Sequence, residues 1–95
     1  EVRVFGRDPE KRDAFVERLT RELPTRVVAA NSVEAATSGA GIVTLVTRAE
    51  EPFLSGAMLA SGAHVNAVGA ILPKNAEFHQ DVFDRCSMLA VDDVA

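Results

Sequence analysis

Two predicted strands end in polar or glycine residues of the kind that bind ligands in α/β proteins. The stretch Ala63–Val68 has the pattern of a buried strand that breaks at Gly69, and it carries Asn66 among apolar neighbours. A buried amide needs a hydrogen-bonding partner or a ligand, because leaving it unpaired away from water is costly. A second stretch, Gly41–Thr47, ends in the same way at Thr47. Because open α/β sheets bind ligands at the carboxyl ends of their strands, we expect a binding site at these two ends.

The sequence gives no indication of a metal site or of a glycine-rich phosphate loop. His64, His79 and Cys86 lack the spacing of any recognised set of metal ligands. No G-x-G-x-x-G motif occurs, and the nearest glycine cluster, Ser38–Gly41, precedes a strand where a phosphate loop would open a helix. If the chain binds a dinucleotide, we expect the glycine loop to lie upstream of Glu1.

The composition excludes several classes of function. With 95 residues, 47% hydrophobic and 25% charged, the chain is a small globular α/β domain or a piece of a larger one. A net charge of −4 provides no basic field for nucleic acid or an anionic membrane, and no apolar run reaches the roughly 18 residues that span a bilayer. Cys86 has no partner for an internal disulfide, and the start does not resemble a signal peptide. We therefore expect a cytoplasmic protein that binds neither nucleic acid nor membrane.

Strands and helices are predicted to alternate along the chain, which is typical of a parallel α/β sheet. The expected strands are Val2–Phe5, Arg26–Ala30, Gly41–Thr47, Ala63–Val68 and Met88–Val91. The expected helices are Pro9–Glu22, Val33–Ser38, one or two turns within Leu54–Ala60, and Asn75–Cys86. The third strand is apolar or β-branched at nearly every position, which predicts that both of its faces are covered.

The first helix has clear start signals. Asp8 can cap its N-terminus, and Pro9 suits the first helical position. Phe15, Leu19 and Leu23 recur every four residues, so we expect them to form the buried face of this helix.

Five segments of the chain form a recognisable set. They are V-R-V-F-G-R-D-P (Val2–Pro9), E-A-A-T-S-G-A-G-I-V-T-L-V-T (Glu34–Thr47), P-F-L (Pro52–Leu54), S-G-A-H-V-N-A-V-G-A with the following Pro and Glu-Phe (Ser61–Phe78), and A-V-D-D (Ala90–Asp93). The most specific part is Gly-x-His-Val-Asn-Ala-Val-Gly. On these segments, the chain resembles the nucleotide-binding half of the ornithine cyclodeaminase/mu-crystallin family over nearly all of its length.

The resemblance implies part of an NAD(P)-dependent enzyme. Proteins of this family combine a Rossmann-type domain with a separate substrate and dimerisation domain, so a homodimer is implied. Residues 1–95 would be a Rossmann-like, three-layer parallel sheet that lacks its first strand, its glycine-rich loop and the following helix. That strand is central in such a sheet, so the piece would leave two strand edges unpaired and would not bind cofactor by itself.

By the same resemblance, the turn at Arg7 and Asp8 faces the adenosine ribose of the cofactor. Sheets that prefer NAD have a carboxylate there, whereas this chain has Gly6 followed by Arg7, whose guanidinium can bind a 2′-phosphate. NADP is therefore the implied cofactor, with NAD as the alternative; the competing interpretation is a solvated arginine beside a capping aspartate. The other cofactor-binding residues that the resemblance implies are Thr47, Asn66, Ala67, Val68 and Gly69. Strand-end and turn chemistry alone would also account for Thr47 and Gly69.

One departure from the family pattern bears on the reaction. Cyclodeaminases carry an aspartate that acts in the chemistry where this chain has Ile71. Isoleucine can neither transfer a proton nor stabilise an iminium charge. The resemblance thus favours an oxidoreductase acting on cyclic imines or amino acids, similar to ketimine or pyrroline-carboxylate reductases. The alternatives are an ornithine cyclodeaminase-type lyase and a crystallin-like protein that binds NADPH without turnover.

No catalytic residue is assigned within the chain, because the proton donor and the groups that bind substrate would come from the other domain. A receiver-like regulatory domain is disfavoured, since the first strand ends in Gly6-Arg7-Asp8 and not in clustered acidic residues.

Overall fold

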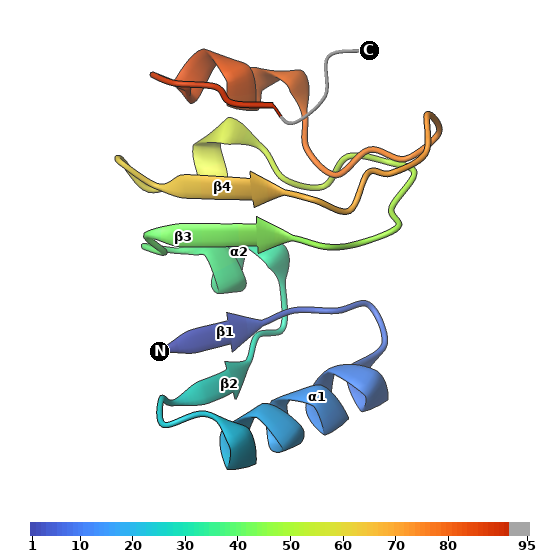
Figure 1. Ribbon diagram of the computed structural model, residues 1–95, viewed down its shortest axis with the longest axis vertical. Coiled ribbons are helices and arrows are strands. Elements are labelled where there is room, and N and C mark those ends of the chain that lie inside the picture. The colour runs from blue at the N-terminus through green and yellow to red at the C-terminus, as the bar shows by residue number, and fades with distance from the viewer. Residues whose placement is uncertain (92–95) are drawn as a thin grey trace.

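The computed structural model describes residues 1–91, in which four short strands alternate with helical segments (Figure 1). The strands are β1 (Val2–Val4), β2 (Val27–Ala29), β3 (Ile42–Leu45) and β4 (His64–Ala67). The helical segments are α1 (Pro9–Glu22), α2 (Val33–Thr37) and the 3-10 turns η1 (Gly56–Met58) and η2 (Gln80–Arg85). Each element lies within a predicted one, so the predicted alternation is confirmed as far as η2.

The strands form two separate parallel pairs. Val2 of β1 lies opposite Val27 of β2, and Ile42 of β3 lies opposite His64 of β4. Figure 1 shows the four arrows pointing the same way in the order β2, β1, β3, β4. Within residues 1–91, β1 and β3 share no ladder, so the edge of each that faces the other pair is unpaired. The parallel α/β class is confirmed, and the two unpaired edges lie where they were expected.

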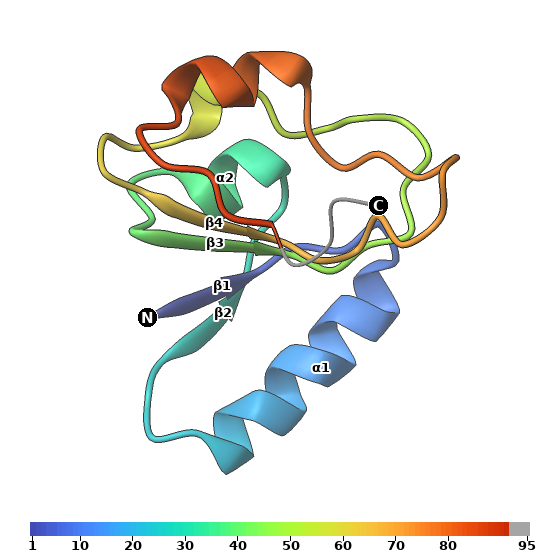
Figure 2. The same ribbon diagram turned by 45° about the horizontal axis from the view of Figure 1, so that its top comes forward.

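Helical segments lie on both sides of the strands. Figure 2 shows α1 on one side of the β1–β2 pair and α2 with the two 3-10 turns on the other side of the strands. The arrangement has the three layers predicted from the sequence. The carboxyl ends of all four strands point to the same end of the molecule, where the loops after β1, β3 and β4 gather.

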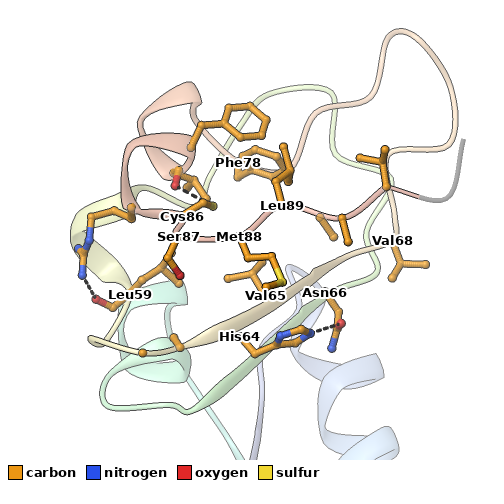
Figure 3. Close-up of a pocket in the computed structure, with 18 of the residues that line it drawn as sticks. Leu59, His64, Val65, Asn66, Val68, Phe78, Cys86, Ser87, Met88 and Leu89 are labelled. Carbon is orange, nitrogen blue, oxygen red and sulfur yellow. Dashed lines mark hydrogen bonds between the residues drawn. The ribbon is translucent and has the colours of Figure 1, made fainter. Parts of the chain in front are cut away.

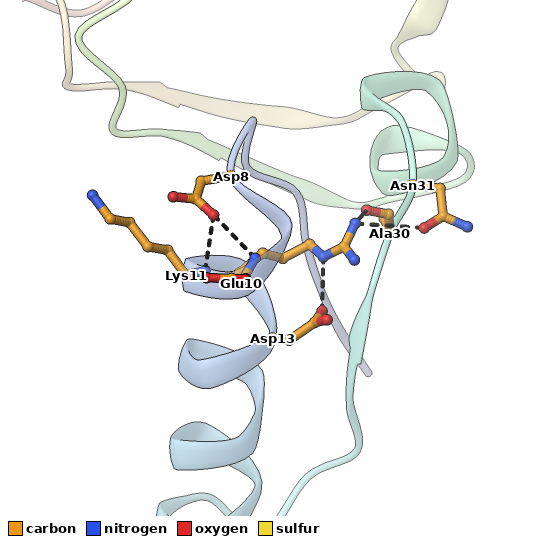
Figure 4. Close-up of polar contacts among 7 residues, drawn as sticks. Asp8, Glu10, Lys11, Asp13, Ala30 and Asn31 are labelled. Carbon is orange, nitrogen blue, oxygen red and sulfur yellow. Dashed lines mark hydrogen bonds and ion pairs between the residues drawn. The ribbon is translucent and has the colours of Figure 1, made fainter.

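Helix α1 begins and ends at the predicted residues because local signals set both ends. The Asp8 carboxylate accepts hydrogen bonds from the backbone N–H groups of Glu10 (3.0 Å) and Lys11 (3.3 Å), which lack partners inside the helix (Figure 4). Pro9 stands in the first turn, where its missing N–H costs nothing.

The buried face of α1 differs from the predicted one. Phe15 and Leu23 are about two-fifths exposed, and the side turned toward the strands is the half-buried row of Arg12, Val16 and Leu19. The sequence period identifies a stripe but cannot say how much of it the neighbouring strands cover. Here the Arg18 guanidinium lies over the exposed Phe15 ring, 5.2 Å from its centroid.

The core lies on the α2 and η side of the β3–β4 pair. Its buried members are Val43, Leu45, Leu54 and Val82. The two members on β3, Val43 and Leu45, alternate with Ile42 and with Val46 just beyond the strand, which are 69% and 70% exposed. One face of this strand is therefore open in residues 1–91, and the prediction that both faces are covered is wrong for this part of the chain.

The predicted helix Asn75–Cys86 is also shorter than expected, because its first residues take part in long-range backbone pairing. The C=O of Glu77 accepts from the N–H groups of Phe53 and Leu54, and the N–H of His79 donates to Leu54. These bonds hold residues 76–79 in an extended conformation, with a bridge between Leu54 and Phe78. Only Gln80–Arg85 is helical, and it forms the 3-10 segment η2, whose Val82 side chain is buried in the core.

The predicted strand Met88–Val91 does not form. The side chains of Met88 and Leu89 are 86% and 64% exposed, and no backbone bond to β4 is found within the described part of the chain. A cavity of about 1240 Å³ separates this segment from β4. The end of the family-like segment Ala90–Asp93 lies outside the described residues. No helix within residues 1–91 combines the length and the hydrophobicity needed to cross a membrane.

Candidate functional site

The two strand ends singled out from the sequence are brought together by the parallel pairing of β3 and β4. Beyond the last paired residues, the Leu45 C=O accepts from the N–H groups of both Val68 (2.9 Å) and Gly69 (3.1 Å). Thr47 and Gly69 therefore face one another across the carboxyl ends of the strands. This is the edge at which parallel sheets bind ligands.

A third residue, Glu77, joins these two ends. Its side chain is 1% exposed, and its Oε2 accepts from the Thr47 backbone N–H (2.6 Å) and the Thr47 hydroxyl (2.7 Å). Its Oε1 accepts from the Gly69 N–H (2.8 Å). We call this set of Glu77, Thr47 and Gly69 the Glu77 clamp. Both carboxylate oxygens are satisfied, as a buried charge requires.

Glycine is required at position 69 because the clamp closes tightly over it. A Cβ atom there would lie 2.5 Å from Glu77 Oε2, and closer still to the backbone N and O of Thr47. The close approach that the sequence predicted for Gly69 is thus made by protein atoms of the clamp. The Thr47 hydroxyl likewise bonds within the chain, to the distant Glu77 side chain and not to its own backbone.

Glu77 was missed as a functional candidate by the sequence reasoning. Its signal was present in the family-like segment, where a glutamate follows the proline after the Val68-Gly69 turn. The sequence pattern places it within the predicted helix Asn75–Cys86. Nothing local shows that this carboxylate would reach Thr47, which is 30 residues away.

Asn66 is not buried, which corrects the prediction from its apolar neighbours. Its side chain lies on the open face of β4, where its Oδ1 pairs with His64 Nε2 (3.0 Å) and its Nδ2 donates to Thr44 Oγ1 (3.4 Å). Figure 3 shows His64 and Asn66 on one face of β4 and Val65 on the other. Two-residue alternation along the strand separates them. These polar neighbours satisfy the amide without burial.

Ala67 and Val68 complete the run from Asn66 to Gly69. Ala67 is the last paired residue of β4, opposite Leu45, and Val68 is 59% exposed. Asn66, Ala67 and Val68 line the cavity beside the 87–91 segment, away from β1. Of this run, only Gly69 takes part in the contacts with Thr47 and Glu77 at the predicted site. The side chains of the other three residues do not.

Arg7 lies at the mouth of a groove between the two strand pairs. The groove has a volume of about 890 Å³, and its walls include Phe5, Gly6 and Arg7 after β1 and the whole of β3 with Thr47. Within residues 1–91, the Arg7 guanidinium makes no hydrogen bond or ion pair to another side chain or to the backbone. Asp8, by contrast, caps α1 through its Oδ1, which accepts both of its hydrogen bonds. The groove thus places Arg7 and Thr47 on one cavity.

A second guanidinium supports the turn that holds Arg7. The Arg12 side chain is 14% exposed, and its Nη1 donates to Ala30 O (3.1 Å) and Asn31 Oδ1 (3.4 Å) while its Nε pairs with Asp13 (3.0 Å) (Figure 4). These contacts fix the start of α1 to the end of β2. Arg12 is therefore a structural residue, and Arg7 remains as the free cation of the turn among the described residues.

The described residues offer no group of three His, Cys, Asp or Glu side chains arranged to bind a metal ion. The functional groups of the site are thus one cation, one buried carboxylate, and the backbone and hydroxyl donors that the carboxylate holds.

Comparison with known proteins places the whole chain in one family. The model described as the ornithine cyclodeaminase/mu-crystallin family matches residues 1–95. The chain is 34% identical over 92 residues to ketimine reductase mu-crystallin of Macropus fuliginosus, which covers 97% of this chain and 28% of that protein. It is 35% identical over 86 residues to ornithine cyclodeaminase of Brucella melitensis, with 88% and 24% covered. The chain thus spans about a quarter of the length of these relatives.

A solved structure shares the fold. Delta(1)-pyrroline-2-carboxylate reductase of Thermococcus litoralis, in complex with NADH and L-proline, matches with a TM-score of 0.78 at 25% identity. The match covers 83% of this chain and 24% of that one. It confirms the Rossmann-like fold class predicted from the sequence.

Proposed function

This chain belongs to the ornithine cyclodeaminase/mu-crystallin family, and from that premise we propose that it is the cofactor-binding part of an NAD(P)H-dependent oxidoreductase acting on cyclic imines or amino acids. The relatives named ketimine reductase and the reductase solved with NADH and L-proline support this choice of reaction. The observation that carries it is the carboxyl edge of the strands, where Arg7 follows β1 and Thr47 follows β3 on the two sides of the groove between these strands.

The groove is also where we place the rest of the Rossmann-type domain. Its two walls are strand edges without partners in the described chain, and they run parallel in the order β2, β1, β3, β4 (Figure 1). A parallel strand from the remainder of the parent chain would satisfy both edges. Its glycine loop and following helix would then complete the cofactor site. We further propose a separate substrate and dimerisation domain, a homodimer and a cytoplasmic location.

The residues present fit an anionic cofactor. Arg7 has an uncommitted guanidinium at the end of β1, and a guanidinium binds phosphate with two parallel hydrogen bonds. We propose that it binds the 2′-phosphate of NADP, with NAD as the alternative that the Thermococcus litoralis complex represents. Asp8 caps α1 through its Oδ1 alone. We propose that it lies with Arg7 at the adenosine ribose of the cofactor.

The chemistry of hydride transfer belongs to the bound nicotinamide, and the protein supplies binding and orientation. In this chain Thr47 and the run Asn66–Gly69 would orient that end of the cofactor. Ile71 is 73% exposed in the loop after β4, and its side chain can neither give nor take a proton. We therefore assign no catalytic residue here and favour a reductase over an ornithine cyclodeaminase-type lyase, which the relative from Brucella melitensis keeps as the second candidate.

The test uses the full-length parent protein. NADPH and NADH are titrated separately by fluorescence, and pyrroline-2-carboxylate is then added while the loss of reduced-cofactor absorbance is followed. Binding of NADPH followed by its oxidation is the expected result. Release of ammonia from ornithine would instead support the lyase. Binding without turnover on cyclic imines or amino acids would support a crystallin-like binding protein, and no binding of either nucleotide would overturn the proposal.

A further inference from the structure

The Glu77 carboxylate is unusual because it is buried without a cation. It is 1% exposed, and no Lys or Arg side chain of the described residues forms an ion pair with it. Its three partners are the N–H and hydroxyl of Thr47 and the N–H of Gly69. A buried carboxylate that is hydrogen-bonded only to N–H and O–H groups restrains the positions of those groups, because losing their bonds would leave it without partners away from water.

The position of the clamp is informative as well. The ladder between β3 and β4 ends at Leu45 and Ala67, so beyond this point the two chains have no regular pairing. Beyond this point the Glu77 side chain links the two chains by hydrogen bonds. Its backbone C=O accepts hydrogen bonds from the N–H groups of Phe53 and Leu54. The carboxylate therefore sets the spacing of Thr47 and Gly69 from a fixed support in the core.

The clamp also sets the hydrogen-bonding role of Thr47. Its hydroxyl proton is donated to Glu77 Oε2, and one lone pair of Oγ1 accepts from the Ala49 N–H (3.3 Å). A hydroxyl has one proton and two lone pairs. What remains at the strand end is a single lone pair, which can accept from an amide N–H but cannot donate.

We propose that Glu77 is a positioning residue for the nicotinamide half of the cofactor: it holds Thr47 as a hydrogen-bond acceptor and Gly69 as a close backbone surface at the ends of β3 and β4. This inference rests on the proposed cofactor-binding function. Glu77 acts through its two partners and touches no ligand itself, since both of its oxygens are used by the protein. The adenosine half is assigned to the β1 end at Arg7, with which the Glu77 side chain forms no hydrogen bond or ion pair.

The experiment compares two ligands in the full-length protein. Glu77→Gln keeps the size of the side chain but places an NH₂ group against N–H or O–H donors, so one side of the clamp opens. The expected result is that the Kd for NADPH rises by about tenfold and kcat falls, while the Kd for 2′,5′-ADP, which lacks the nicotinamide half, stays within about twofold of wild type. Glu17→Gln, which removes the same charge from the exposed face of α1, is the control and should change neither value.

Each other outcome overturns the inference. Equal weakening of NADPH and 2′,5′-ADP would show that Glu77 has a general structural role, and unchanged NADPH binding and turnover would show that the clamp does not position the cofactor. Failure of the wild-type protein to bind either ligand would overturn the proposed function itself, and this is seen without any variant. If Glu77→Gln does not fold, Thr47→Val removes the two hydrogen bonds of the hydroxyl, to Glu77 and from the Ala49 N–H, and leaves both backbone bonds to Glu77. The Thr47→Val variant should still bind NADPH more weakly than wild type and bind 2′,5′-ADP with unchanged Kd.

Discussion

Replacing Gly69 by alanine tests the geometry of the clamp most directly. The new Cβ would clash with the backbone N and O of Thr47, so the ends of β3 and β4 would have to move apart. It would also lie 2.5 Å from Glu77 Oε2, so the carboxylate would have to retreat by about 0.9 Å to reach an ordinary contact of 3.4 Å. A retreat of that size along the bonds to Thr47, now 2.6 and 2.7 Å, would lengthen both to about 3.5 Å, beyond hydrogen-bonding range.

The magnitude follows from those two bonds. A hydrogen bond to a charged group contributes about 1.5–3 kcal/mol, and a buried carboxylate without its partners carries a desolvation cost as well. We expect Gly69→Ala to lower the free energy of unfolding of the full-length protein by about 3–5 kcal/mol. Movement of the loop after β4 will relieve part of the strain. The expected loss in the free energy of unfolding is therefore smaller than the sum of all the interactions in the clamp.

Urea unfolding of the full-length protein provides the assay, with Gly41→Ala as the matched control. Gly41 has ordinary backbone angles, and a Cβ there would meet nothing within 4 Å. Its replacement should leave the free energy of unfolding within about 1 kcal/mol of wild type or raise it slightly. An effect of Gly69→Ala as small as that of Gly41→Ala would show that the clamp does not enclose Gly69 tightly and would refute the predicted clash.

Three further substitutions test other parts of the structure. Arg7→Ala should raise the Kd for NADPH by about tenfold and leave that for NADH unchanged, because only NADPH carries the 2′-phosphate; equal effects in fluorescence titrations would contradict the assignment. Asp8→Ala should lower the free energy of unfolding by about 1 kcal/mol, since two N–H groups of α1 lose their acceptor, whereas Asp8→Asn should cost less; equal losses in urea unfolding would argue against capping. Leu54→Ala should cost about 3 kcal/mol in the same assay, because its side chain is fully buried in the core. A loss below about 1 kcal/mol would mean that Leu54 is not a core residue.

The elements that sequence reasoning predicted well are those with local causes. The Asp8-Pro9 pair begins α1 at the predicted residue because a cap acts over two or three positions of the chain. Strands β1 to β3 follow from short runs rich in β-branched residues, and β4 lies within the largely apolar run Ala63–Val68. The alternation with helices predicts their parallel direction. The family also follows from the sequence, because its motifs can be recognised without any knowledge of which residues are in contact.

The misses arose where distant residues decide the outcome. Phe15 and Leu23 have helical spacing, but the neighbouring strands leave both partly exposed. Asn66 lies in an apolar run, and it is the pleat and the register with Thr44 that place its side chain on the open face. Residues 76–79 form no helix because their backbone groups pair with the 49–54 segment, and Met88–Val91 forms no strand because no neighbouring backbone bonds to it within the described chain.

The sequence by itself therefore determined the fold class, the order of the elements and the family, and it singled out the two strand ends that form the proposed binding site. Only the tertiary structure decided what holds those ends. Glu77 reaches Thr47 across 30 residues and Gly69 across eight, and a hydrogen bond over such separations depends on how every intervening element packs. A carboxylate has no local preference for that position, so its role is visible only once the chain is folded.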